Sequence, residues 1–160
     1  TRNKKLYIYL EKNDTFSERL IFLFFHLALF LKHFKTTIPP KNLQELFDFI
    51  IRQIELSIRE IGYGDVSVNS KMKNYVNLFH LILQKVEKWD EIPNEEKKVF
   101  FKNNLNIQSK LDYLLEYFDK YIKFLSNNPL NCFGARHASV SSCTITTRWF
   151  RGARRLEEAR

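Results

Sequence analysis

Residues 42–76 read NLQELFDFIIRQIELSIREIGYGDVSVNSKMKNYV, and this stretch decides the fold. In its first part, apolar residues recur three or four positions apart, which places them on one face of a helix. These residues are Leu43, Leu46, Phe47, Ile50, Ile54, Ile58 and Ile61. Gly62 follows at once, and helices commonly end on a glycine in the left-handed conformation. The pattern predicts a helix that Asn42 and Glu45 cap at its start and Gly62 ends.

A second helix is predicted after the glycine-containing turn GYGDVSV at residues 62–68. Asn69 or Ser70 can cap the start of this helix, because both side chains accept hydrogen bonds from backbone N–H groups. Its apolar positions are Met72, Tyr75, Val76, Phe79, Leu83 and Val86. Residues 42–86 therefore predict two helices joined by a sharp reversal.

The longest apolar run lies upstream, at residues 20–31, LIFLFFHLALFL. A helix that spans a membrane needs about 20 apolar residues, so a shorter run favours a buried core helix. Thr15 and Glu18 form a capping box at the expected start of this helix. It is apolar on all sides, which is typical of the centre of a bundle or of a helix that packs against a partner.

Downstream of residue 90, two more helices are predicted. A shorter amphipathic segment covers residues 95–103, and Ser109 with Asp112 suits the start of a last helix. The apolar stripe of that helix is Leu111, Leu114, Leu115, Phe118, Ile122 and Leu125. Only four glycines and four prolines are present, which leaves little material for β-turns. The sequence therefore predicts an all-α fold, a compact helical bundle of about five to six helices in residues 1–130.

The last thirty residues differ in composition from the rest of the chain. The net charge of +8 divides into +4 for residues 1–130 and +4 for the much shorter residues 131–160. The second segment uses Arg, Ala, Ser and Thr and contains both cysteines, Cys132 and Cys143. We interpret residues 131–160 as an atypical basic tail that is vector-derived or read out of frame; the alternative is a native tail that binds RNA or lipid.

The glycine-containing turn and the lysines after it are the first candidate site. A phosphate-binding loop is disfavoured, because its glycines would need a preceding strand and a different spacing. Lys71 and Lys73 are expected in the first turn of the following helix, where the helix dipole disfavours positive charge. This local conflict favours a role for both lysines in contacting a partner. Arg59 is either an ordinary surface charge or pairs with Asp65 to fix the turn.

His26 is the second candidate, and it lies within the apolar run. A lone histidine there is typically a hydrogen-bonded core residue. Haem ligation by His26 and Met72 is chemically possible, but nothing in their spacing supports it. No nucleophile with a nearby base and no zinc-ligand spacing is evident. We therefore expect no catalytic residues, no metal, no cofactor and no small-molecule substrate.

Residues 42–76 resemble the signature of the ubiquinol–cytochrome c chaperone family, in which an Arg-Glu-apolar-Gly-x-Gly-Asp turn precedes a Lys-Met-Lys helix start. The matching positions are Arg59, Glu60, Gly62, Gly64, Asp65, Lys71, Met72 and Lys73. The upstream helix is also similar, with Arg19 and an apolar run that carries His26. After Tyr75 the chain departs from the family, which tends towards an aromatic-Gly-Arg cluster where residues 78–80 read LFH.

The resemblance implies a non-catalytic assembly chaperone that binds cytochrome b, nascent or partly assembled, during biogenesis of the cytochrome bc1 complex. It also implies contact with another bc1 subunit, a small assembly partner or the ribosome, and possible peripheral contact with a membrane. The eight matching residues are the expected partner-binding site, beside an apolar groove left by the Phe-rich helices. The expected location is the bacterial cytoplasm at the inner membrane face, or the mitochondrial matrix and inner membrane. The alternative is a membrane-surface or RNA/ribosome-binding helical module.

Overall fold

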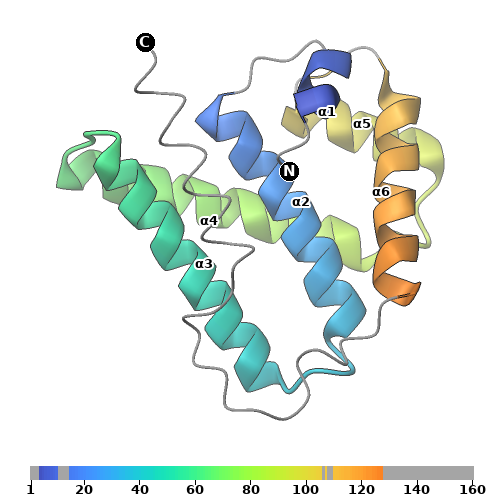
Figure 1. Cartoon of the computed structure of the whole chain (residues 1–160), viewed down its shortest axis with the longest axis horizontal. Coiled ribbons are helices and arrows are strands. Elements are labelled where there is room, and N and C mark those ends of the chain that lie inside the picture. Colours follow the sequence, from blue (N-terminus) through green and yellow to red (C-terminus); the bar gives the residue numbers. More distant parts are fainter. Residues whose placement is uncertain (1–3, 11–14, 106, 108–109, 128–160) are drawn as a thin grey trace. The chain divides into compact units, whose positions relative to one another are not determined.

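The computed structural model describes residues 4–10, 15–105, 107 and 110–127 (Figure 1). Within these residues the chain forms six helices and no strand. The helices are α1 (Lys4–Tyr9), α2 (Phe16–Phe34), α3 (Pro40–Glu60), α4 (Asp65–Glu87), α5 (Asn94–Leu105) and α6 (Leu111–Asn127). The predicted all-α fold of five to six helices is confirmed. The predicted basic tail lies outside the described residues.

The described residues divide into two compact units, and the division falls within α4. The first, which we call the aromatic unit, contains α1, α2, α5, α6 and the last part of α4 from Phe79 onward. The second, which we call the hairpin unit, is Lys35–Leu78 and contains α3 and the first part of α4.

The core of the aromatic unit is built from phenylalanine rings on α2, α5 and α6. Phe101 and Phe118 stack with ring centroids 5.4 Å apart, and Phe25 packs on both at 5.1 and 5.5 Å. Such ring pairs stabilise by about 0.5–1.5 kcal/mol each beyond the area that they bury. The buried residues of α2 are Leu20, Phe22, Phe24, Phe25, Leu27, Ala28, Leu29 and Phe34. The apolar run is thus a core helix, as predicted.

His26 lies half-buried beside this cluster, and both of its ring nitrogens have partners. Nδ1 donates to the carbonyl oxygen of Phe22 at 2.6 Å, so Nε2 accepts from the hydroxyl of Tyr117 at 3.0 Å. Tyr121 donates to the carbonyl oxygen of His26 at 3.5 Å. Burial lowers the pKa of His26 from 6.5 to about 4, so the ring is neutral at pH 7. The predicted hydrogen bonding of this histidine is confirmed, whereas its side chain is half-buried at the edge of the core.

The helix starts agree with the sequence in one case and differ in another. At α2, the Thr15 hydroxyl accepts from the backbone N–H of Glu18 at 3.4 Å, which confirms the Thr15 half of the predicted capping box. The predicted capping of α3 by Asn42 and Glu45 is wrong, because the helix begins earlier, at Pro40, without a side-chain cap. Proline suits this first position, since its missing N–H would have no partner there and its φ is already helical.

The start of α4 also differs from the prediction. The helix begins at Asp65, so Asn69 and Ser70 lie inside it and do not cap it. Asp65 places a negative charge in the first turn, where the helix dipole favours it. Lys71 and Lys73 are therefore beyond the first turn, and the expected conflict between these lysines and the helix dipole does not exist.

The last helix, α6, begins close to the predicted position. Leu111 is its first residue and Asp112 lies in its first turn, whereas Ser109 is outside the described residues. Lys110 precedes the helix with a φ of 62° and its carbonyl oxygen accepts from the N–H of Leu114 at 3.4 Å. The positive φ turns the chain into the helix.

Candidate functional site

The turn between α3 and α4 is built on one glycine. Gly62 has a φ of 100°, in the region that side chains avoid. Its N–H bonds to the carbonyl oxygen of Arg59 at 2.9 Å, and the N–H of Ile61 bonds to that of Ser57 at 3.2 Å. These bonds satisfy carbonyl groups that the end of α3 would otherwise leave without partners. The predicted ending of the helix at Gly62 is confirmed.

The two glycines of the turn have different roles, which a pair of substitutions tests. Gly62→Ala is expected to lower the free energy of unfolding by about 1–2 kcal/mol, because alanine is strained at positive φ. Gly64→Ala is the matched control, since an added Cβ there meets nothing within 4 Å and the backbone is outside the positive-φ region. Urea unfolding measures both. Equal losses in the two variants would contradict this account of the turn.

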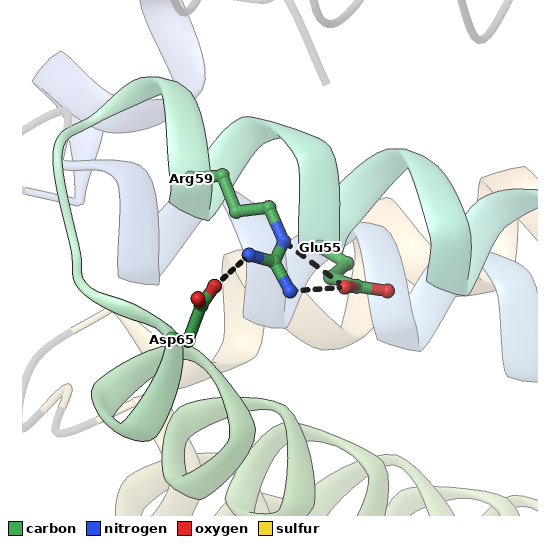
Figure 2. A network of polar contacts seen from close by, with 3 residues as sticks. All are labelled: Glu55, Arg59 and Asp65. Carbon is green, nitrogen blue, oxygen red and sulfur yellow. Dashed lines mark hydrogen bonds and ion pairs between the residues drawn. The ribbon is translucent and has the colours of Figure 1, made fainter.

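An arginine joins the two helices across the turn, as Figure 2 shows. The Nε and Nη2 atoms of Arg59 donate to one carboxylate oxygen of Glu55 at 3.1 and 3.0 Å. Its Nη1 atom donates to Asp65, the first residue of α4. Of the two interpretations that the sequence left open, pairing of Arg59 with Asp65 is therefore the observed one. Glu55 was not singled out, although it precedes Arg59 by four residues, a spacing typical of helical ion pairs.

The network places two carboxylates around one guanidinium. The hydrogen bonds that Arg59 donates, first to Asp65 and second to Glu55, raise the pKa of Arg59 above its ordinary value. All three side chains are accessible to water, and exposed pairs of this kind contribute little to stability. The network links the last turn of α3 to the first residue of α4.

Lys71 also reaches back to the turn. Its Nζ atom lies 4.4 Å from the centre of the Tyr63 ring, within the range of a cation–π contact. Tyr63 itself is 43% exposed. No sequence pattern indicated this pair, because the two residues are eight positions apart on different elements.

A groove runs along the hairpin unit between α3 and α4. The residues that line it are Ile51, Glu55, Asn69, Met72, Lys73, Val76 and Asn77. Ile51, Met72 and Val76 are half-buried apolar side chains, whereas Asn69, Lys73 and Asn77 are exposed. Two residues of the predicted partner-binding site, Met72 and Lys73, thus line the groove together with Ile51 and Glu55 of α3.

Several exposed apolar residues lie in the turn between α3 and α4 or next to it in the sequence. They are Leu56 at 45%, Ile61 at 36%, Tyr63 at 43% and Val66 at 86% exposure. All four fall within eleven consecutive residues, around the turn that Arg59 fixes. An exposed apolar cluster next to fixed charges is typical of a surface that another molecule covers.

The eight predicted site residues are therefore spread over several parts of the hairpin unit. Arg59 and Asp65 belong to the ion-pair network, Lys71 lies over Tyr63, and Met72 with Lys73 lines the groove. Glu60 is the last residue of α3, and Gly62 and Gly64 form the turn. Whether these residues bind a partner stays a prediction.

The described residues contain no group of three His, Cys, Asp or Glu side chains that could hold a metal ion. None of the described helices has the length and apolar character required to traverse a lipid bilayer. Fold and site together define an all-helical protein whose turn and groove are its most distinctive surfaces.

Comparison with known families shows the family to which this chain belongs. The sequence model of the family described as Ubiquinol-cytochrome C chaperone matches residues 9–91, which is 83 of 160 residues, and the chain belongs to this family. The resemblance in the sequence is thereby confirmed. The matched segment includes α2, α3, the turn and α4. No curated protein and no solved structure matches the chain significantly.

Proposed function

We propose that this chain is a non-catalytic assembly chaperone of the cytochrome bc1 complex, and that it binds cytochrome b before or during assembly. The observation that carries the proposal is that the family match contains the whole hairpin, with its exposed apolar turn and its groove. A chaperone for a membrane protein needs such a surface, because the apolar helices of its client are exposed before insertion.

The turn suits binding without chemistry. Arg59 holds Glu55 and Asp65, so the apolar side chains of the turn are presented on a fixed backbone. Fixing a surface before it binds lowers the entropy cost of association. The proposed site therefore acts by shape, apolar contact and charge.

The remaining partners and the location are part of the same proposal. A small assembly partner and the ribosome would bring the chaperone to newly made cytochrome b. The site of action would be the cytoplasmic face of a bacterial inner membrane, or the matrix side of the mitochondrial inner membrane. The exposed apolar turn supports a role next to a membrane, because it provides apolar surface beside charged groups.

Deletion of the gene tests the proposal directly. In the deletion strain, assembled bc1 complex and cytochrome b are expected to fall strongly, and the wild-type gene is expected to restore both. Native electrophoresis and haem spectra measure the two quantities, with another respiratory complex as the control. Normal levels of both in the deletion strain would refute the chaperone function.

A membrane-surface or RNA-binding module without an assembly role gives a different result. Its binding to anionic vesicles or to RNA would fall steeply with salt, because counterions are released on binding, and the deletion would leave the bc1 complex intact. This combination would replace the proposed function with the alternative.

A further inference from the structure

We propose that the groove between α3 and α4 takes an amphipathic helix of a partner protein, and that an acidic residue on this helix pairs with Lys73. This inference deepens the proposed function and rests on it for the kind of partner, a protein. It adds the secondary structure and the charge of the segment that binds.

The floor of the groove is apolar and open. Ile51 on α3 and Met72 and Val76 on α4 are half-buried, so each keeps apolar surface that the hairpin itself does not cover. Met72 and Val76 are one helical turn apart and form a continuous strip. Methionine adapts its shape to a partner, which suits a surface that binds another chain.

The rim of the groove has one charge without a partner among the described residues. Lys73 is exposed and forms no ion pair with any described carboxylate, whereas Glu55 on the opposite wall is held by Arg59. Asn69 and Asn77 flank Lys73 at four-residue spacing and are uncharged. The groove therefore complements an apolar segment that carries a single acid.

The form of the groove favours a helix as its occupant. An apolar strip between two helices is the typical receptor for the apolar face of a third helix. Addition of a strand needs a free sheet edge, and the described residues contain no strand. A nucleic acid would need a row of cations, whereas the groove lining contains one, Lys73. Small-molecule sites enclose most of their ligand, and three of the seven lining residues here are exposed.

The test combines photo-cross-linking with charge reversal in the full chain. A benzophenone amino acid at Asn77 is expected to cross-link an apolar helical segment that contains Asp or Glu, identified by mass spectrometry of the linked peptide. The same group at Lys41 is the matched control, because this exposed residue of α3 lies ten positions, or about 15 Å, from Ile51 along the helix axis.

Lys73→Glu is expected to reduce the Asn77 cross-link at least about tenfold, since an attractive pair becomes repulsive. A change of the partner's acid to Lys is expected to restore it. The substitution creates no new ion pair at four-residue spacing, because residues 69 and 77 are asparagines. Circular dichroism checks the fold, and Lys123→Glu on α6 is the control for a change in net charge.

The outcomes separate this inference from the proposed function. Loss of the cross-link with Lys73→Glu and its recovery by the reversed pair supports the groove. An unchanged cross-link, a linked segment without an acid, a link to lipid or RNA, or no excess over Lys41 overturns it. One combination of results separates the two proposals. If the deletion lowers the level of assembled bc1 complex, and the Lys73→Glu chain restores that level and still cross-links as before, the groove inference fails. The chaperone function stands in that case.

Discussion

Phe118→Ala is expected to lower the free energy of unfolding by about 3–5 kcal/mol, the range for removal of a buried aromatic side chain. Phe118 has no exposed surface, and its ring contacts Phe25, Phe101 and His26 at centroid distances of 5.5, 5.4 and 5.2 Å. These neighbours come from α2 and α5, so no single helix can shift to fill the space. The cavity would therefore persist, and the stacking with Phe101 would be lost.

Phe124→Ala is the matched control for this prediction. Phe124 is on the same helix, but 59% of it is exposed, so its removal takes little apolar area out of the interior. Urea unfolding followed by circular dichroism compares both variants with the parent chain. A loss for Phe118→Ala no larger than that for Phe124→Ala would show that the phenylalanine cluster is not the main source of stability.

Acidification is expected to destabilise the fold through His26. Its folded-state pKa is about 4, below the ordinary 6.5, so between these pH values the unfolded chain binds a proton that the folded chain does not. Stability is therefore fully present above pH 6.5 and falls by about 1.4 kcal/mol per pH unit below it, about 3 kcal/mol by pH 4. Protonation would also place a hydrogen on Nε2, which now accepts from Tyr117.

His26→Gln isolates this contribution from that of the carboxyl groups that titrate in the same range. The variant is expected to be less stable at pH 7 and to lose less stability between pH 6.5 and 4 than the parent. His80→Gln is the control for the substitution itself, because His80 is exposed. Urea unfolding across this pH range measures the slopes, and identical slopes in all three proteins would rule out His26 as their source.

Periodicity was sufficient to predict α3 and α6, whereas α1 was not predicted. The apolar spacing from Leu43 to Ile61 and from Leu111 to Leu125 gave α3 and α6, because burial of one face selects positions three and four apart. The end of α3 at Gly62 was also predictable, since few residues other than glycine adopt a φ near 100°.

The helix starts were less predictable, because several polar residues near each start could serve as a cap. For α4, the sequence offered Asn69 and Ser70, yet the helix includes four further residues from Asp65. The sequence could not show that Asp65 would be held by Arg59, which needs the turn geometry. Because of this error, Lys71 and Lys73 were expected in the first turn of the helix, where the helix dipole disfavours positive charge. In the structure both lysines lie beyond the first turn, so this argument for a binding role does not apply.

The candidate site could be predicted from the sequence only in part. Arg59 and Asp65 were named together, but their pairing was one of two open interpretations. Glu55 had a detectable signal in its four-residue spacing from Arg59. The contact of Lys71 with Tyr63 and the groove beside Met72 depend on how the backbone reverses, which no local pattern specifies.

The guanidinium that bridges Glu55 and Asp65 gives the bend of the hairpin a dependence on ionic strength that the phenylalanine cluster lacks. Dissolved ions weaken attractions between water-accessible charges, with a screening length of about 3 Å at 1 M salt. Ring packing among phenylalanines has no such sensitivity. Concentrated electrolyte would therefore loosen the bend between α3 and α4 while leaving the Phe25–Phe101–Phe118 cluster intact.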